Sequence, residues 1–298
     1  MRLRRSELSV PGSSEKMLAK GAASDADMVF CDLEDAVAPN QKADARKQIV
    51  NALTTLDWGR KTRAIRINGP HTHWCHDDVI EVVTGAGDAL DLIIVPKVNG
   101  PRDVWFVETL LDQVETKLGR AKSIALEVLI EESAALACVE EIARCSQRLE
   151  AIIFGPGDMS ASQGVRYALA READYPGDIW HHARARIVTA ARAAGIEAVD
   201  GPFANFRDDD GYRKEALGAA LMGFIGKWAI HPAQVPIAND VFSPTEREVS
   251  NARELVDAYR AAEEAGEGAT GGGGRMVDAA TARIMQVILD RAAAIEGA

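Results

Sequence analysis

Two acidic residues follow neighbouring apolar runs of the sequence. Glu131 comes directly after residues 124–130, and Asp158 comes shortly after residues 152–154. The runs are continuous rather than alternating, which is typical of strands buried on both faces of a parallel sheet, and residues 133–147 between them have helical periodicity. Parallel neighbours lie about 4.8 Å apart and Mg2+ binds oxygen at about 2.0–2.1 Å, so both carboxylates could share one cation. Turn capping or pairing with a base is the alternative.

Arg66 ends a third apolar run, at residues 62–69. A buried guanidinium needs an anion, and its planar shape suits a carboxylate. That anion is either a bound carboxylate or a structural partner such as Glu34 or Asp35. Both can hold together, because a neighbouring acid orients the guanidinium.

Lys97 and Lys227 also lie at predicted strand ends. A metal-free aldolase would need a lysine that forms a Schiff base. Pairing with a carboxylate is the favoured interpretation for both lysines.

Two loops carry weaker signals. His71, His73, Cys75 and His76 crowd into one loop without the spacing of a zinc site, which favours a solvated loop. Residues 11–14 turn into a helix that bears Lys20, and such a helix start can bind phosphate. A proline–glycine turn is also ordinary loop punctuation.

Eight strand candidates must position these residues, and segments with helical periodicity, such as 41–56, 102–118 and 179–199, separate most of them. The candidates are residues 7–12, 27–35, 62–69, 91–98, 124–132, 150–158, 196–203 and 224–232. This alternation favours a (β/α)8 TIM barrel over an open doubly wound sheet. No GxGxxG motif follows the first strand, which disfavours a dinucleotide fold.

Polar residues gather at the predicted strand ends, where a barrel holds its active site. They are Asp32, Glu34, Asp35, Arg66, Asn68, Lys97, Glu131, Asp158, Asp200 and His231.

The pattern changes after the eighth strand, which predicts a barrel domain over residues 1–242 and a helical extension over residues 243–298. Ser243 is expected to cap a helix that ends near residue 265. The glycine-rich residues 266–274 read as a hinge or a plain flexible linker, and a last helix is expected from about Asp278 to Ile295.

The composition limits the partners. The net charge is −11, from 34 basic and 45 acidic residues, and no basic run occurs, which argues against nucleic acid. No apolar stretch reaches the length of a membrane span, and the four cysteines form no CxxC pair. These features predict a cytoplasmic protein with reduced thiols and no membrane partner.

Taken in order, several motifs resemble the citrate-lyase β-subunit-like branch of the HpcH/HpaI aldolase superfamily, and within it the malyl-CoA and β-methylmalyl-CoA lyases. They include LSVPGSSEKMLAKG, VFCDLEDAVAPNQKADAR, KTRAIRING, IIVPKV, LEVLIEES, IFGPGDMSAS, AVDGPF, GKWAIHPAQVPIANDVFSP and GRMVDAATARI. The resemblance covers nearly the whole chain.

The resemblance implies a barrel that binds Mg2+, with Mn2+ as a substitute, through Glu131 and Asp158. Arg66 would hold a 2-oxo acid such as glyoxylate or pyruvate. Asp278 would be an acid on a C-terminal lid, contributed to a neighbouring subunit of a homotrimer or hexamer. The coenzyme A contacts implied by the family fall near Ser9, Ser14, Lys20, Gly157, Ile230 and His231.

Two departures concern the substrate. Ser9 and Ser14 stand where many malyl-CoA lyases have an aromatic residue and an arginine, and residues 159–178 are shorter than in relatives. The retained lid favours a free coenzyme A thioester over an acyl-carrier protein.

The expected activity is reversible cleavage of malyl-CoA or β-methylmalyl-CoA to acetyl-CoA or propionyl-CoA plus glyoxylate. A citramalyl-CoA lyase, a malyl-CoA thioesterase, a malate-synthase-like condensing enzyme and a citrate lyase β subunit are the alternatives on the same barrel. A non-catalytic acyl-CoA-binding protein is a further one.

Overall fold

A computed structural model describes residues 2–166, 178–266, 268–272 and 275–297. Most of the short segment after Asp158 and three positions of the expected hinge lie outside these residues. Two compact units are present, one of residues 4–239 and one of residues 1–3 with 240–298.

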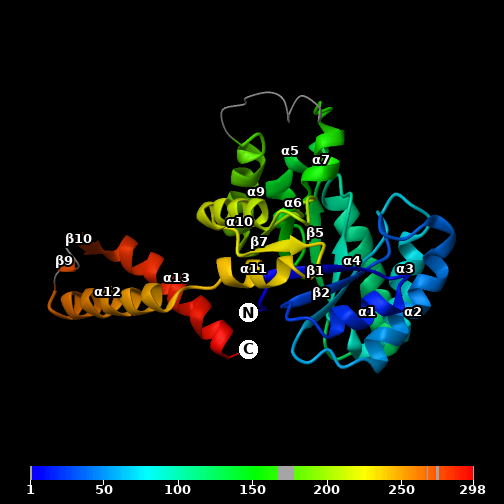
Figure 1. Ribbon diagram of the computed structural model, residues 1–298, viewed down its shortest axis with the longest axis horizontal. Helices are drawn as coiled ribbons and strands as arrows, with labels where there is room; N and C mark the ends of the chain where they lie inside the picture. Colours follow the sequence, from blue (N-terminus) through cyan, green and yellow to red (C-terminus); the bar gives the residue numbers. More distant parts are fainter. Residues whose placement is uncertain (1, 167–177, 267, 273–274, 298) are drawn as a thin grey trace. The chain divides into compact units, whose positions relative to one another are not determined.

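Eight parallel strands close into a barrel in chain order, with β8 paired to β1 (Figure 1). This confirms the predicted barrel. The strands are β1 (Ser6–Pro11), β2 (Met28–Asp32), β3 (Thr62–Arg66), β4 (Leu92–Val95), β5 (Ala125–Ile130), β6 (Leu149–Phe154), β7 (Glu197–Asp200) and β8 (Gly226–Ala229).

The barrel strands are buried because both of their faces are covered. All six residues of β5 and all four of β4 are buried, as the continuous apolar runs predict. Alternate residues point inward and fill the barrel interior. This interior cluster consists of Met28, Phe30, Ala64, Leu92, Ile94, Ala125, Leu129, Ala151, Ile153, Val199 and Trp228.

Helices follow the strands and pack their apolar faces against them. Gly119 and Gly195 end two of these helices with φ values of 64° and 74°, a conformation that glycine adopts at little cost. The helices are α1 (Glu15–Ala22), α2 (Lys42–Thr55), α3 (Cys75–Ala86), α4 (Pro101–Leu118), α5 (Ser133–Ala137), α6 (Val139–Ala143), α7 (Pro156–Ser162), α9 (His181–Ala194), α10 (Asp209–Met222) and α11 (Gln234–Val241).

The segment between β5 and β6 differs from the single helix that its periodicity suggests. The chain forms two short helices, α5 and α6, which meet at Cys138. The Cys138 thiol lies 3.6 Å from the carbonyl oxygen of Asn99 and 3.3 Å from that of Ala134. The expected apolar residues still face inward, since Leu136 and Ile142 are buried.

The C-terminal unit contains α12 (Glu246–Glu264), α13 (Ala279–Glu296) and a hairpin of β9 (Ala269–Gly272) and β10 (Arg275–Asp278). The expected cap at Ser243 is wrong. Thr245 caps α12, because it accepts from the Glu248 amide at 3.2 Å while the Glu248 carboxylate accepts from the Thr245 amide at 2.7 Å.

The expected hinge contains a strand. Residues 269–272 pair with residues 275–278 through backbone hydrogen bonds, which need no side chains. Hinge motion of this segment stays a prediction.

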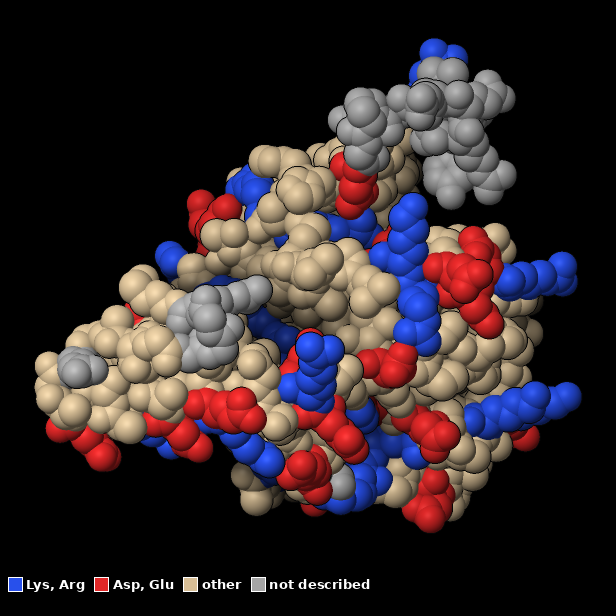
Figure 2. All heavy atoms as spheres, turned by 60° about the vertical axis from the view of Figure 1, so that its left-hand side comes forward, with Lys and Arg blue, Asp and Glu red and all other residues tan. Residues whose placement is uncertain are grey.

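The surface carries both signs of charge. On the face shown in Figure 2, Lys and Arg side chains are interleaved with Asp and Glu side chains over the residues drawn in colour. Within the described parts of the chain, no helix combines the length and apolar character needed to cross a bilayer.

Candidate active site

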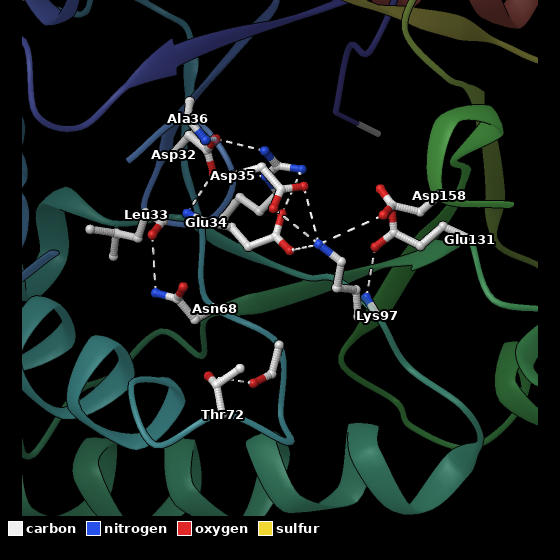
Figure 3. A network of polar contacts seen from close by, with 12 residues as sticks. Asp32, Leu33, Glu34, Asp35, Ala36, Asn68, Thr72, Lys97, Glu131 and Asp158 are labelled. Atoms are coloured by element: carbon white, nitrogen blue, oxygen red, sulfur yellow. Dashed lines mark hydrogen bonds and ion pairs between the residues drawn. The ribbon is translucent and has the colours of Figure 1, made fainter. Parts of the chain in front are cut away.

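The two strand-end acids lie side by side at the carboxyl ends of β5 and β6. These strands are neighbours in register, with Ile130 opposite Phe154, and the Gly155 amide donates to the Ile130 carbonyl at 3.0 Å. Glu131 follows β5 directly, and Asp158 lies in the first turn of α7. Figure 3 shows the two carboxylates on the same side of the barrel, close to each other. The two acids thus lie at the ends of neighbouring strands, as the sequence suggested, and their binding of a shared cation stays a prediction.

Gly155 makes room for this arrangement. A Cβ atom at position 155 would lie 2.5 Å from Glu131 Cβ and 2.9 Å from Glu131 Oε2. Distances below 3.0 Å are not tolerated between such atoms, so any side chain here would displace the Glu131 carboxylate. The glycine therefore leaves room for the Glu131 side chain in the position that it occupies.

Glu131 is 2% exposed and accepts a hydrogen bond from the Lys97 amide at 2.8 Å. Burial, together with the charges of Glu34 and Asp158, raises its pKa to about 8. A carboxyl group with such a pKa receives too little positive charge from the surrounding protein to stabilise its ionised form. A cation beside it would favour its ionised form.

Asp158 completes an oxygen donor pair that fits Mg2+. Its side chain is 40% exposed, and the nearest basic atom is Lys97 Nζ, at 3.9 Å. Each carboxylate thus retains an oxygen that makes no hydrogen bond to a described residue, and hard divalent cations prefer such oxygens. No group of three His, Cys, Asp or Glu side chains in the described chain could hold a metal, so water and substrate would have to supply the other ligands.

Lys97 links this acid pair to the loop after β2. Its φ of 52° is unusual for a residue other than glycine and directs its amide toward Glu131. Its Nζ donates to Glu34 and, at 3.1 Å, to both oxygens of Asp35. Burial alone would lower the pKa of Lys97, but these two acids outweigh it and raise the pKa. An ammonium group held in this way is a poor Schiff-base nucleophile.

Arg66 ends β3 opposite Asp32 in the sheet register. Asp32 accepts from Arg66 Nε at 2.7 Å and from Nη2 at 2.6 Å, and Glu34 Oε2 lies 3.0 Å from Nη1. Burial disfavours the charge, but the two acids raise the pKa of Arg66, so the guanidinium stays protonated. Two of its five N–H donors bind Asp32 and Nη1 pairs with Glu34 Oε2, which leaves two donors without such a partner. They are available to a carboxylate ligand.

The sequence points to Glu34 and Asp35 as the partners of Arg66. Glu34 contacts Arg66, whereas Asp35 hydrogen-bonds Lys97 instead. The bidentate partner is Asp32, which the sequence placed at a strand end without assigning it a partner. The parallel pairing of β2 with β3 sets Asp32 directly opposite Arg66, and this register was the signal that could have found it.

A further lysine supports the loop that carries Glu34. Lys42 Nζ donates to the Leu33 carbonyl at 2.8 Å, to the Glu34 carbonyl at 2.9 Å and to Asn68 Oδ1 at 2.5 Å. Figure 3 shows Asn68 facing Leu33, and the Asn68 amide group is in turn bound by Asp78. Sequence reasoning missed Lys42, because a lysine in a helix start is usually solvated.

Residues 5–232 match the HpcH/HpaI aldolase/citrate lyase family. The chain belongs to this family. The L-malyl-CoA/β-methylmalyl-CoA lyase of Cereibacter sphaeroides is 45% identical over 299 residues, covering 97% of this chain and 94% of that protein. The (3S)-malyl-CoA thioesterase of the same species is 36% identical over 274 residues, covering 92% of this chain and 89% of that protein.

A solved structure of a family member also resembles the chain. It is the protein CitE from Mycobacterium tuberculosis in complex with magnesium, acetoacetate and coenzyme A. The TM-score is 0.79 at 28% identity, and the match covers 98% of this chain and 100% of that one. The resemblance stated from the sequence is thereby confirmed.

The residues that the family implies for coenzyme A lie at different places around the barrel. Ser9 is within β1, and Gly157 is in α7, where an added Cβ would meet no atom within 4 Å. Ile230 is exposed after β8, and His231 stacks on Phe206 with ring centroids 5.2 Å apart.

Ser14 and Lys20 lie at opposite ends of α1. Ser14 caps α1, and its hydroxyl accepts from the Met17 amide at 3.4 Å. Lys20 is exposed in the last turn of α1, about 9 Å along the helix axis from Ser14 at 1.5 Å per residue. Roles for these residues in coenzyme A binding stay predictions.

Asp278 lies in the C-terminal unit and caps α13. Its Oδ1 accepts from the Thr281 amide at 2.8 Å and from the Thr281 hydroxyl at 3.0 Å. These hydrogen bonds lower the pKa of Asp278, which favours the ionised, proton-accepting form. Its role as a lid acid stays a prediction.

The remaining candidates have structural surroundings. Lys227 is fully buried, and its Nζ contacts Asp200 and Glu215, each at 2.6 Å. Cys75 is buried at the start of α3. His71 lies 3.0 Å from the amide nitrogen of Asn99. The family's chemistry is therefore expected at the Glu131–Arg66 side of the barrel.

Proposed function

We propose that this chain is a Mg2+-dependent carbon–carbon lyase of the HpcH/HpaI family that acts on 3-hydroxyacyl-CoA thioesters. Its substrate is malyl-CoA or β-methylmalyl-CoA, and its products are acetyl-CoA or propionyl-CoA plus glyoxylate. The reaction is reversible.

One observation carries the proposal. A carboxylate pair, in which each acid has an oxygen without a hydrogen bond to a described residue, lies at the same end of one barrel as a guanidinium with unused donors. Lys97 and Glu34 join the two, since Lys97 contacts Glu131 through its amide and Glu34 through its ammonium group. Both features suit a small 2-oxo acid. A cation held by the carboxylate pair would bind its oxygens, and the planar guanidinium would donate hydrogen bonds to its carboxylate. The 45% identity to a named malyl-CoA/β-methylmalyl-CoA lyase supports this substrate.

Glu131 and Asp158 would hold Mg2+, with Mn2+ as a substitute of similar ligand preference. When bound, the ion lowers the pKa of the substrate hydroxyl and stabilises negative charge on the oxo acid. The magnesium in the related CitE structure supports this choice of metal.

Arg66 binds the carboxylate and carbonyl oxygens of the oxo acid and is held in place by Asp32 and Glu34. In the cleavage direction the substrate hydroxyl passes its proton to water and its oxygen becomes the carbonyl oxygen of the oxo acid. The C–C bond breaks, and the electron pair of that bond moves onto the thioester as an enolate. Arg66 stays charged throughout and offers preorganised donors for the developing negative charge.

Asp278 handles the proton at the acyl carbon. In cleavage, the enolate carbon takes a proton from Asp278 in its acid form. In condensation, ionised Asp278 removes a proton from the methyl group of acetyl-CoA. We assign it to a lid that serves a neighbouring subunit in a homotrimer or hexamer, in a cytoplasmic enzyme.

A thioesterase is the second candidate function, favoured by the 36% identity to a (3S)-malyl-CoA thioesterase. It would use the same metal and arginine but would direct water to the thioester carbonyl. The lyase and the thioesterase differ in products, because hydrolysis yields free malate and coenzyme A without glyoxylate. Product identity would also distinguish a citramalyl-CoA lyase, a malate-synthase-like condensing enzyme, a citrate lyase β subunit or a non-catalytic binder.

The test incubates the protein and Mg2+ with malyl-CoA, β-methylmalyl-CoA and citramalyl-CoA and identifies products by mass spectrometry. We expect acetyl-CoA or propionyl-CoA with glyoxylate, and loss of turnover in EDTA that added Mg2+ restores. Arg66→Lys, which keeps the charge but loses the fork, should lower kcat/KM by at least about a hundredfold. Free malate without glyoxylate would establish the thioesterase, and full activity in EDTA would refute the metal role.

A further inference from the structure

Two aromatic rings in the barrel interior lie against the Arg66 guanidinium. The Trp228 ring centroid is 5.5 Å from Arg66 Cζ, and the Phe30 centroid is 6.0 Å from it. The two rings contact each other, with centroids 4.4 Å apart. Asp32 fixes the guanidinium along one edge, whereas these rings limit its tilt out of that plane. Cation–π contacts of this kind are strongest where water is excluded.

Trp228 is itself anchored from below. Its indole N–H donates to Glu7 Oε2 at 2.8 Å, and its carbonyl accepts from the Tyr212 hydroxyl at 3.2 Å. The parallel pairing of β1 and β8 sets Glu7 opposite Trp228. Glu7 is fully buried, and its Oε1 makes no hydrogen bond within the described residues.

Glu7 is an unfavourable group to keep in this place. Burial, with the nearby Glu127 carboxylate, raises its pKa and thus favours its protonated form. A buried acid with one unbonded oxygen destabilises the fold compared with an apolar residue of similar size. The hydrogen bond that Glu7 does make goes to the Trp228 indole, which packs against Arg66.

We propose that Glu7 and Trp228 are positioning residues for oxo-acid binding: Glu7 fixes the Trp228 ring, and the ring fixes the Arg66 guanidinium. The inference rests on the proposed function, in which Arg66 holds the oxo acid. We call Glu7, Trp228 and Arg66 the column, because they form a chain of contacts through the barrel interior that ends at the proposed oxo-acid site.

The column predicts a selective effect. Loss of the indole N–H bond lets the ring rotate or tilt, which changes the plane of the guanidinium but not the residues that bind the thioester. The affinity for the oxo acid should fall while the KM for acetyl-CoA stays the same. A purely structural role would lower stability without separating the two substrates.

The experiment compares four variants of the full chain in the presence of Mg2+. Trp228→Phe keeps a ring but removes the N–H donor, and Glu7→Leu removes the acceptor. Glu7→Gln keeps an acceptor oxygen in a neutral group of the same size. Trp58→Phe is the matched control, because Trp58 is 4% exposed against 3% for Trp228 and donates its N–H to the Ala52 carbonyl, away from Arg66.

Two quantities are measured. Calorimetry gives the Kd for glyoxylate and for pyruvate, and condensation assays give KM for each substrate. We expect Trp228→Phe and Glu7→Leu to raise the oxo-acid Kd by about three- to tenfold. Glu7→Gln should stay within about twofold of the parent, as should Trp58→Phe.

Each outcome decides something. If Trp228→Phe and Trp58→Phe bind the oxo acid with equal Kd, the column is refuted. The proposed function would still stand in that case, provided that the parent chain cleaves the thioester. A parent chain that binds no oxo acid and cleaves no thioester would refute both. If Glu7→Leu does not fold, the two tryptophan variants decide alone.

Discussion

Replacing Asp32 by Asn tests how Arg66 is held. Asp32 accepts four hydrogen bonds, two from Arg66 and two from the amides of Glu34 and Ala36, at 2.9 and 3.1 Å. An Asn side chain has one acceptor oxygen, so in either orientation its NH2 group faces two donors. The substitution also leaves Glu34 as the one acid in direct ion-pair contact with the buried guanidinium among the described residues.

Breaking a buried ion pair from one side costs roughly 3–5 kcal/mol. We therefore expect Asp32→Asn to lower the free energy of unfolding by about that amount, measured by urea denaturation. We also expect kcat/KM for the lyase reaction to fall roughly ten- to a hundredfold, because a displaced guanidinium misplaces the oxo acid.

Asp91→Asn is the matched control. Asp91 pairs with Arg63, which lies on β3 like Arg66, through Arg63 Nε at 2.9 Å, but the Asp91 and Arg63 side chains are 11% and 26% exposed. Because Arg63 remains partly exposed, loss of this pair should cost less than loss of the Asp32–Arg66 pair, and the pair does not touch Arg66. Equal stability losses in the two variants, or unchanged kcat/KM in Asp32→Asn, would show that Asp32 does not hold Arg66 for binding.

Three further outcomes are expected. Asp278→Asn should lower turnover at least about a hundredfold while calorimetry shows unchanged Mg2+ affinity, and near-normal turnover would remove Asp278 from the mechanism. Burial raises the pKa of Glu7, so above pH 4.5 the folded chain keeps a proton that the unfolded chain releases. The free energy of unfolding should therefore fall as pH rises above the pKa of about 4.5 in the unfolded chain. Glu7→Gln should thus be less pH-sensitive than the parent chain in urea denaturation between pH 5 and 8, and parallel curves would contradict this. Lys97→Met should change the Mg2+ Kd little, but it should disorder Glu34 and raise the oxo-acid KM roughly fivefold. Lys97→Gly also relaxes the strained backbone beside Glu131 and should therefore alter the Mg2+ Kd as well. Identical Mg2+ Kd values in the two variants would refute the role of the backbone.

The barrel was predictable because its signal is repeated eight times. Continuous apolar runs such as 124–130 can be buried only between two layers, and their alternation with helical segments leaves few topologies. The break at Cys138 was not predictable, because the periodicity of the apolar residues continues through it. The helix start at Thr245 was readable from its spacing to Glu248, although Ser243 and Pro244 imitate a cap.

The candidate site was predictable to the level of residue types at strand ends. Glu131, Asp158 and Arg66 could be singled out because each closely follows or ends a buried run. Their partners depend on which strands are neighbours and in which register, and that information is long-range. Asp32 and Arg66 are 34 positions apart, and only the β2–β3 register joins them.

Charge balance differs between two of the ionic clusters of the barrel, one around Lys227 and one at the strand ends. The first cluster holds two cations and three acids, namely Arg184, Lys227, Asp178, Asp200 and Glu215. Its formal charge is −1, and each of its acids contacts Arg184. The second cluster, at the strand ends, holds three cations and five acids, namely Lys42, Arg66, Lys97, Asp32, Glu34, Asp35, Glu131 and Asp158.

The excess of two negative charges in this second cluster falls on its Glu131–Asp158 side, since Arg66 and Lys97 bind the other three acids. Without a further cation, proton uptake is the only way to reduce the excess, which agrees with the pKa of about 8 for Glu131. A divalent cation would neutralise it and would leave the free donors of Arg66 as the strongest remaining attraction for an anion. In the proposed function, the same side chains would therefore account for metal binding first and for oxo-acid binding second.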